Sequence, residues 1–397
     1  MKLIERSDYL NRLLDAAGTP DIKVITGIRR SGKSKLLESF IDKIKQGNPD
    51  ANIVHINFNL TEYENLKEYH ALEEYVRRSY IPGKDNYVCI DEVQMCDGFE
   101  KAVNSLHESQ EYDIYVTGSN AFLLSSDLST LFTGRTFEVE VYPFSFSEYC
   151  EYYKPEDICR AFDNYALEGG MSGSYLYKKA DDKYRYIRGV FETLVLRDIS
   201  QKYRIKNKSL LDSICDYLLD NTSNLTSTRN IADNLIAKKI KTNDKTVGNY
   251  LKYLCNAFAF YKVRKYDIRG KKYLASQDKY YLADHSFKYA ILGTKNMDYG
   301  RVYENIVAIE LLRRGYEVYA GALYKKEIDF VAIKQNEKIY IQVSDDITGE
   351  ETFDRETSPL LKIADAYPKM VLARTRHEEY SYEGIHIVDI ADWLRNK

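Results

Sequence analysis

Residues 27–34 constrain the fold most strongly, because they read Gly-Ile-Arg-Arg-Ser-Gly-Lys-Ser and match the pattern G-x-x-x-x-G-K-[ST]. An apolar run at 22–26 precedes this motif, and a segment at 34–44 with helical periodicity follows it. In such a loop the glycines let backbone amide groups turn towards phosphate oxygens, and the next helix adds the positive end of its dipole. The motif therefore predicts a strand, a phosphate-binding loop and a helix, which together begin an α/β domain.

The same motif predicts which residues contact the nucleotide. We expect Lys33 to reach the β- and γ-phosphates of ATP, and we expect the Ser34 hydroxyl to bind Mg²⁺. The predicted nucleotide-binding residues are Gly27, Ile28, Arg29, Arg30, Ser31, Gly32, Lys33 and Ser34. ATP and Mg²⁺ are therefore the predicted cofactors.

A second apolar run ends in two carboxylates. Residues 87–90 are mostly apolar, and Asp91 and Glu92 follow them directly. We predict that Asp91 holds the magnesium ion and that Glu92 polarises the attacking water. An adjacent glutamate at this position is typical of ATPases that hydrolyse their nucleotide.

Two further positions are candidates for contact with the γ-phosphate. The strand at 114–117 leads into Ser119 and Asn120, either of which can bridge the γ-phosphate and the attacking water, and we favour Asn120. Arg135 can act as a finger that stabilises the developing charge. The alternatives are a plain strand-to-helix turn for Asn120 and a surface or salt-bridged arginine for Arg135.

Apolar strands and helical segments alternate in the first half of the chain. This alternation predicts a parallel sheet covered on both faces. The expected strands are 22–26, 53–58, 87–90 and 114–117, and the expected helices are 34–44 and 69–79.

These motifs resemble those of the AAA-type P-loop ATPases common in bacteria and archaea, in which a C-terminal region of unknown function follows the ATPase. The likeness extends over essentially the whole chain. Matching segments are 27–34, 90–94, 117–120, 196–199, 246–251 and 327–330. The resemblance implies an AAA-type ATPase domain with a helical lid at 1–205, a winged-helix domain at 206–293 and a restriction-endonuclease-like domain at 294–397.

Three short helices and a hairpin describe the winged-helix module. The helices are expected at 210–219, 230–237 and 246–258, and the strands at 260–267 and 272–275. The predicted wing carries Lys262, Arg264, Lys265, Arg269, Lys271 and Lys272, and Lys238, Lys239, Lys241 and Lys245 lie upstream. These side chains predict contact with a DNA backbone. The alternative is a solvated hairpin, or a module that packs against the ATPase.

The last hundred residues resemble the restriction-endonuclease-like fold in their order of helix, three strands, helix and strand. Working members carry an acidic residue on the first helix, an aspartate on the second strand and Glu-x-Lys on the third. Glu304 and Asp329 match the first two positions, whereas Gln342 and Ser344 stand at the positions of the glutamate and the lysine. Because an amide binds a hard divalent cation less well than a carboxylate does, we predict a degenerate nuclease fold. Lys325 or Lys326 can replace the lysine.

Charge, cysteine spacing and the length of apolar runs exclude several classes of protein. The net charge of −3 argues against a protein that coats nucleic acid over its whole surface. The six cysteines show no C-x-x-C spacing, and no apolar run is long enough to span a membrane. The charged first residues show no secretory signal. We therefore expect a cytoplasmic protein without a membrane partner.

The sequence supports three hypotheses for function. The first is an ATPase whose nucleotide state moves a winged-helix and nuclease-like module, with DNA as one candidate partner. The second is a slow nucleotide switch that recruits a protein partner. The third is an active, ATP-regulated metal-dependent nuclease, which we consider less favoured. The oligomeric state is left open.

Overall fold

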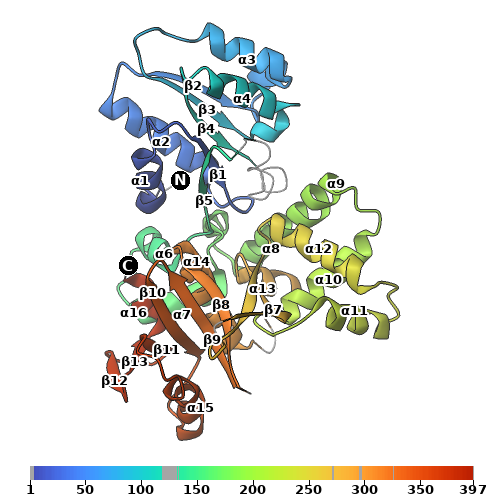
Figure 1. Cartoon of the computed structure of the whole chain (residues 1–397), viewed down its shortest axis with the longest axis vertical. Coiled ribbons are helices and arrows are strands. Elements are labelled where there is room, and N and C mark those ends of the chain that lie inside the picture. The colour runs from blue at the N-terminus through green and yellow to red at the C-terminus, as the bar shows by residue number, and fades with distance from the viewer. Residues whose placement is uncertain are drawn as a thin grey trace. The chain divides into compact units, whose positions relative to one another are not determined.

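The computed structural model describes residues 4–118, 132, 134–270, 272–294, 297–324 and 326–396 (Figure 1). Contacts between residues divide the chain into two compact units. Unit 1 comprises residues 1–141 and 256–258, and unit 2 comprises residues 142–255 and 259–397. The domain boundaries at 205/206 and 293/294 remain predictions.

Unit 1 is built around a parallel sheet with the strand order β2-β3-β4-β1-β5. Its strands are β1 (Ile22–Thr26), β2 (Asn52–Asn57), β3 (Asn86–Asp91), β4 (Asp113–Thr117) and β5 (Thr136–Glu140). Its α-helices are α1 (Ser7–Asp15), α2 (Lys33–Gly47), α3 (Tyr69–Arg78) and α4 (Phe99–Glu108). The predicted parallel α/β sheet is confirmed. All carboxyl ends of its strands meet at one edge, where the loop 27–34 lies.

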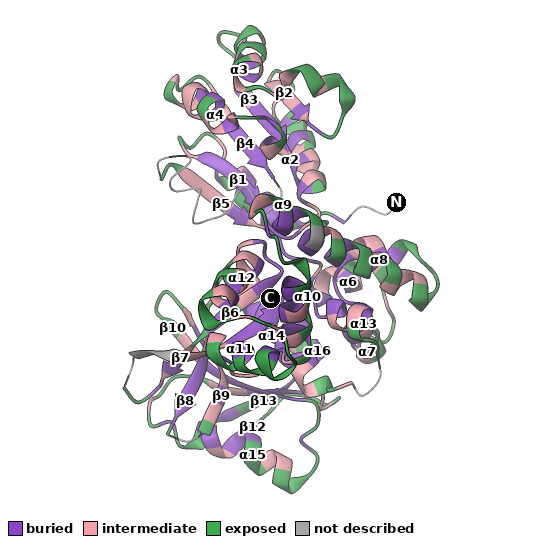
Figure 2. Cartoon of the chain, turned by 90° about the vertical axis from the view of Figure 1, so that its right-hand side faces the viewer, coloured by how far each residue is buried: buried purple, intermediate pink, exposed green. Residues whose placement is uncertain are grey.

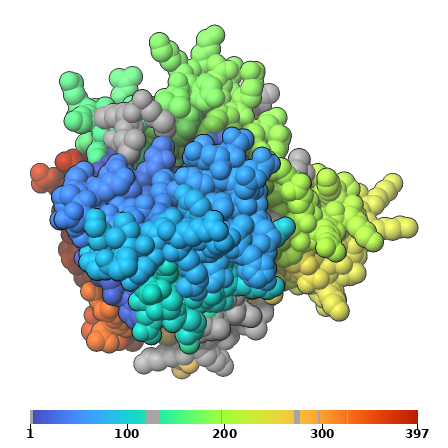
Figure 3. All heavy atoms as spheres, turned by 90° about the horizontal axis from the view of Figure 1, so that it is seen from above, coloured from blue at the N-terminus to red at the C-terminus, as the bar shows by residue number. Residues whose placement is uncertain are grey.

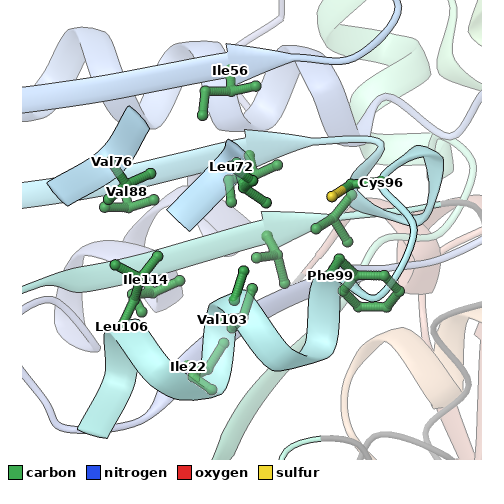
Figure 4. Close-up of a cluster of buried hydrophobic side chains, with 14 of the residues drawn as sticks. Ile22, Ile56, Leu72, Val76, Val88, Cys96, Phe99, Val103, Leu106 and Ile114 are labelled. Atoms are coloured by element: carbon green, nitrogen blue, oxygen red, sulfur yellow. The ribbon is translucent and has the colours of Figure 1, made fainter. Parts of the chain in front are cut away.

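Branched and aliphatic side chains make the core of unit 1. Figure 4 shows Val88 and Ile114 from the strands together with Val76 of α3 and Leu106 of α4. All four of these side chains are at most 2% exposed. This apolar layer fixes α3 and α4 against one face of the sheet and so holds the carboxyl ends of β3 and β4 in place. Figure 3 shows the outer surface of unit 1 in blue and cyan.

The amino-terminal part of unit 2 is helical. Its α-helices are α6 (Phe146–Tyr153), α7 (Ile158–Glu168), α8 (Ala180–Glu192), α9 (Ser200–Lys202), α10 (Lys208–Asp220), α11 (Thr228–Ala237), α12 (Asp244–Asn256) and α13 (Ser286–Leu292). Ser145 begins α6 with a capping box: its hydroxyl accepts from the Glu148 amide, and the Glu148 carboxylate accepts from the Ser145 amide. The three helices predicted from 210 to 258 are confirmed as α10, α11 and α12.

A second sheet continues through the rest of unit 2 in the order β12-β13-β11-β10-β9-β8-β6-β7. Its strands are β6 (Phe260–Asp267), β7 (Lys272–Leu282), β8 (Glu317–Leu323), β9 (Lys326–Lys334), β10 (Glu337–Ser344), β11 (Lys369–Ala373), β12 (Tyr380–Tyr382) and β13 (Ile385–Asp389). Strands of this sheet contact the helices α14 (Tyr299–Arg313), α15 (Glu350–Leu361) and α16 (Ile390–Arg395). Figure 2 shows that α14 is buried over most of its length, from Val302 to Leu311.

The predicted wing is part of this second sheet. β6 pairs with β7 on one side and, in parallel, with β8 on the other, where Arg264 lies opposite Tyr319. The amide of Ile268 at the hairpin tip donates to the carbonyl of Ala322. The hairpin is therefore not a free-standing wing, because it shares its backbone hydrogen bonds with the strands that follow.

Candidate nucleotide-binding site

The loop between β1 and α2 has the curled backbone that a phosphate site requires. Gly27 has φ +127°, and a Cβ atom there would lie 2.1 Å from the carbonyl oxygen of Val141. Gly32 has φ +100° and Arg30 has φ +66°, so the chain turns through left-handed conformations before α2 begins at Lys33. Glycine is needed at position 27 for space and at position 32 for its conformation.

Lys33 and Arg6 hold this loop from two sides. The buried Lys33 ammonium donates to the carbonyl oxygens of Gly27 at 2.9 Å and Ile28 at 3.0 Å. The Arg6 guanidinium, also buried, donates to the carbonyl oxygen of Ser31 at 2.8 Å. The Ser31 hydroxyl is buried and has no hydrogen-bond partner within the described part of the chain. A cation and an unsatisfied hydroxyl in a curled loop fit an anionic ligand such as a triphosphate.

Ser34 and Asp91 meet across the edge of the sheet. The Ser34 hydroxyl donates to Asp91 Oδ1 at 3.1 Å, and the Asp91 side chain is almost fully buried at the end of β3. A hydroxyl and a carboxylate are oxygen ligands suited to Mg²⁺. The structure brings this predicted pair together, and their role as metal ligands stays a prediction.

Glu92 directly follows the last residue of β3 and has a left-handed conformation with φ +56°. Its amide donates to the Thr117 hydroxyl at 3.2 Å, and its carboxylate accepts a hydrogen bond from the Gln94 amide. Thr117 also donates to Asp91. Thr117 therefore connects the two acidic residues to β4 and fixes their positions.

Sequence reasoning missed Thr117 and Gln94. Thr117 is a polar residue that ends a buried strand, and this signal was available because it directly precedes the residues considered for γ-phosphate contact. Gln94 lies two residues after Glu92, but nothing in that spacing alone indicates that the two side chains meet. Asn120 and Ser119 lie outside the described residues.

Arg135 lies at the opposite edge of the sheet from the loop 27–34. Its carbonyl accepts from the amide of Ile22, and Thr136 is in register with Ile22 at the amino end of β1. The Arg135 guanidinium, about half exposed, forms an ion pair with Glu108. Arg135 therefore does not approach the phosphate loop of its own chain, and this geometry matches the salt-bridged alternative. A finger role now requires the phosphate loop of another chain.

The residues predicted for the degenerate nuclease site are partly gathered in unit 2. The Asp329 carboxylate accepts from the Val343 backbone amide at 2.8 Å. The side-chain oxygen Oε1 of Gln342 accepts from the Asp329 backbone amide at 2.7 Å. The Gln342 amide group donates to Glu356 at 2.9 Å. By contrast, Ser344 donates to the carbonyl of Asp346. Gln342 is thus used as a hydrogen-bond bridge.

A lysine does reach these carboxylates, but from an unexpected strand. Lys279 of β7 contacts Glu304 of α14 and Glu327 and Asp329 of β9. Lys326 instead donates to the Ser358 hydroxyl at 2.7 Å, and Lys325 lies outside the described residues. Lys279 was missed because its partners are distant in sequence. The available signal was that this lysine directly precedes the hydrophobic run 280–283.

Two features are absent from the described residues. No group of three or more histidine, cysteine, aspartate or glutamate side chains among them is arranged to hold a metal ion. Within the same residues, no helix has the length and apolar character that a membrane crossing needs.

The parallel sheet, the glycine loop at the end of β1 and the adjacent Ser34–Asp91 pair define a P-loop domain. Residues 19–150 match the family described as an AAA domain, which confirms this part of the expected resemblance. Residues 159–298 match a domain of unknown function. The winged-helix and nuclease-like assignments stay predictions.

The chain belongs to the family of an uncharacterised protein from Haemophilus influenzae, to which it is 38% identical over 400 residues, covering 99% of this chain and 98% of that protein. An uncharacterised protein from Methanocaldococcus jannaschii is 25% identical over 359 residues, covering 86% and 79% of the two chains. Among solved structures, a Walker-type ATPase of Pyrococcus abyssi matches with a TM-score of 0.49 and 16% identity over 72% of this chain and 95% of that chain.

Proposed function

We propose that this chain binds ATP with Mg²⁺ at residues 27–34 and hydrolyses it. The observation that carries the proposal is the meeting of Ser34 with Asp91, beside Lys33 and next to Glu92. Ser34 and Asp91 are the residues that would hold Mg²⁺, which when bound neutralises charge on the phosphate oxygens. The unsatisfied Ser31 hydroxyl and the closely packed Gly27 support a bound triphosphate.

In this proposal each side chain has a separate task. Lys33 exchanges the carbonyl oxygens of Gly27 and Ile28 for phosphate oxygens. Glu92 orients the attacking water and accepts its proton, while Thr117 keeps the backbone of Glu92 in position. The inward-facing loop amides and the N-terminus of α2 stabilise the charge that develops on the phosphate.

The contact between Gln94 and Glu92 supports slow turnover in the isolated chain. The Glu92 carboxylate accepts from Gln94 and so points towards a neighbouring side chain. Glu92 must leave this hydrogen bond, or share it, before it takes a proton from water. This feature favours the second candidate function, a nucleotide switch whose hydrolysis is accelerated when a partner releases Glu92.

A binding measurement tests the first step of the proposal. Titration calorimetry with a non-hydrolysable ATP analogue should give binding for the wild type that is strengthened by Mg²⁺. Lys33→Ala should weaken binding at least about tenfold, because it removes the buried cation that pairs with phosphate oxygens. Lys35→Ala is the matched control, since Lys35 lies on the same helix but is exposed and paired with Glu38. Equal affinities for wild type and Lys33→Ala contradict the proposed site.

We also propose that unit 2 contacts a DNA backbone. Lys239, Lys241 and Lys245 are exposed around the start of α12. The predicted wing contributes less, because Lys262 is paired with Asp278 at 2.7 Å and the Arg269 guanidinium lies 5.2 Å from the ring centre of Tyr324. The positive surface near α12 supports contact with phosphates without base recognition.

Fluorescence anisotropy with duplex DNA tests this second proposal. The affinity for DNA should fall steeply as the salt concentration rises from about 50 to about 200 mM, because salt weakens contacts with phosphates over that range. The triple variant Lys239→Ala, Lys241→Ala, Lys245→Ala should lower the logarithmic salt slope by about 3. An affinity that does not change with salt, or a slope unchanged in the variant, contradicts this proposal.

For the carboxyl-terminal part we propose a degenerate nuclease-like domain that does not cut DNA. The amide of Gln342 takes the position of a carboxylate, and both of its polar atoms are engaged within the protein. Ser344 carries no positive charge and is directed to a backbone carbonyl. This pattern supports a domain kept for binding or assembly.

A further inference from the structure

Lys279 carries a buried ammonium group that is surrounded by carboxylates. Its Nζ atom lies 2.7 Å from Glu304 Oε1, 2.5 Å from Glu327 Oε1 and 3.8 Å from Asp329 Oδ1. The Lys279 side chain is only 2% exposed. Two of its acidic partners, Glu304 and Asp329, are the residues that match the metal-binding positions of a nuclease.

Local contacts fix the ammonium group in this position. The side chain of Asn305 on α14 accepts from the Leu282 amide at 2.7 Å and donates to the Leu282 carbonyl at 2.9 Å. These two bonds hold the end of β7 against α14. The Tyr281 hydroxyl donates to Glu304 Oε1 at 2.6 Å, the same oxygen that accepts from Lys279. The Lys279 ammonium and the Glu304 carboxylate therefore belong to one connected network.

Charge complementarity explains why the ammonium group lies at this point. Burial penalises the charged form of a carboxylate unless an opposite charge or hydrogen-bond donors lie beside it. The Lys279 ammonium lies among the carboxylates of Glu304, Glu327 and Asp329. Lys279 therefore supplies the opposite charge from within the chain.

We propose that the Lys279 ammonium occupies the cation position of this carboxylate cluster and so replaces a divalent metal ion with a group built into the chain. Carboxylate oxygens of α14 and β9 approach the same ammonium group. The distances from Nζ to Glu304 and Glu327, 2.7 and 2.5 Å, are those of close, hydrogen-bonded ion pairs. This inference rests on the nuclease-like part of the proposed function and is independent of ATP hydrolysis.

The other role for Lys279 is that of a catalytic lysine beside a bound metal. The short contacts with Glu304 and Glu327 favour replacement, because an ammonium at those distances occupies the space that the metal needs. Removing the ammonium should therefore create a metal site rather than destroy one. The two roles give opposite results for the same variant.

Manganese binding to the nucleotide-free full chain, measured by electron paramagnetic resonance, tests the proposal. The wild type should show no Mn²⁺ binding that depends on Asp329, so wild type and Asp329→Asn should give the same titration. Lys279→Met keeps the apolar stem but removes the charge, and it should bind one additional Mn²⁺ ion. This extra binding should be lost in Lys279→Met/Asp329→Asn. Thermal unfolding should show Mn²⁺ raising the midpoint of Lys279→Met by several degrees and leaving the wild type unchanged.

Each contrary result overturns the proposal. Mn²⁺ binding by the wild type that is lost in Asp329→Asn, with metal-dependent DNA cleavage lost in Lys279→Met, assigns Lys279 the catalytic role instead. Equal Mn²⁺ binding by Lys279→Met and the double variant shows that the cluster is not a cation site. If Lys279→Met unfolds, Mn²⁺ should restore its folding, and failure to restore it contradicts the replacement of metal by ammonium. The ATP-binding measurement is unaffected by any of these outcomes and tests the ATPase separately.

Discussion

The hydroxyl oxygen of Ser34 lies 3.1 Å from a carboxylate oxygen of Asp91, although the two residues belong to different βα units of the sheet. Ser34 is in the first turn of α2, and Asp91 ends β3. β4 lies between β1 and β3, so the contact spans the carboxyl edge of the sheet. This pair is the basis of the proposed Mg²⁺ dependence.

Asp91→Asn should weaken the use of Mg²⁺ more than the binding of nucleotide. The amide keeps the shape of the carboxylate but is a poorer ligand for a hard cation. We expect the Mg²⁺ concentration for half-maximal ATP turnover to rise at least about tenfold, with smaller changes in affinity for nucleotide without metal. A magnesium titration of phosphate release measures this. An unchanged midpoint would show that Asp91 does not serve the metal.

Gln94→Ala should increase basal ATP turnover several-fold. The substitution removes the hydrogen bond that Gln94 donates to Glu92, so the carboxylate no longer has to leave this contact before it accepts from the attacking water. The comparison needs saturating ATP, so that turnover and affinity are separated. Gln110→Ala on the same unit, exposed and remote from Glu92 along the chain, is the control. Turnover that stays constant or falls in Gln94→Ala would argue against a restraining role.

Gly170→Ala should destabilise unit 2 by about 2 kcal/mol or more, because overpacking forces the backbone to shift. A Cβ atom at Gly170 would lie 2.2 Å from the carbonyl oxygen of Phe144. The Gly170 amide also donates to the buried carboxylate of Asp284 at 2.6 Å, a contact that the shift would disturb. Chemical denaturation measures the change.

Gly189→Ala is the matched control for this substitution. Gly189 lies inside α8, and a Cβ atom there meets nothing within 4 Å. Alanine is favoured over glycine in a helix by about 1 kcal/mol, so Gly189→Ala should stabilise the protein. Equal effects of the two substitutions would contradict the close packing described at Gly170.

Acid should destabilise the protein through His285. Burial lowers the pKa of this imidazole below its ordinary value of 6.5, and one of its ring nitrogens lies 3.0 Å from the Tyr165 carbonyl oxygen. Below pH 6.5 the unfolded chain takes up a proton that the folded chain resists. The free energy of unfolding should therefore fall as the pH drops from 6.5 towards the folded pKa, by at most about 1.4 kcal/mol per pH unit.

Denaturation curves at pH 7.5 and 5.5 check this contribution. His285→Gln should reduce the pH dependence, although it also lowers stability at both pH values. His386→Gln is the control substitution, because His386 is half exposed and lies on another element, β13. A pH dependence that is the same in wild type and His285→Gln would assign the acid sensitivity to other groups.

The backbone geometry of the loop 27–34 was predictable because its signals are local. The turn at Gly27 and Gly32 needs glycine for reasons that act within a few residues, and this need appears in the sequence as a motif. The position of Asp91 follows from one further rule, that parallel strands end at a common edge. The turn and the end of β3 at Asp91 could therefore be predicted from the sequence.

Features that depend on distant partners were not predictable in the same way. Arg135 was placed near the phosphates because the short strand β5 after it was not recognised; that strand puts Arg135 at the amino edge. The pairing of β6 with β8 joins the predicted wing to the following strands, and no local pattern indicates which strand β6 pairs with. Lys279 meets Glu304 and Asp329 only through this long-range arrangement.

The most direct test of the account is Mg²⁺-dependent phosphate release by wild type and Glu92→Gln, combined with ATP binding by both. Glutamine keeps the size of Glu92 but cannot accept a proton from water. We expect Glu92→Gln to bind ATP with nearly wild-type affinity and to lose about 10²–10⁴-fold in turnover. Wild-type turnover in Glu92→Gln, or no Mg²⁺-dependent phosphate release by the wild-type chain, would contradict it.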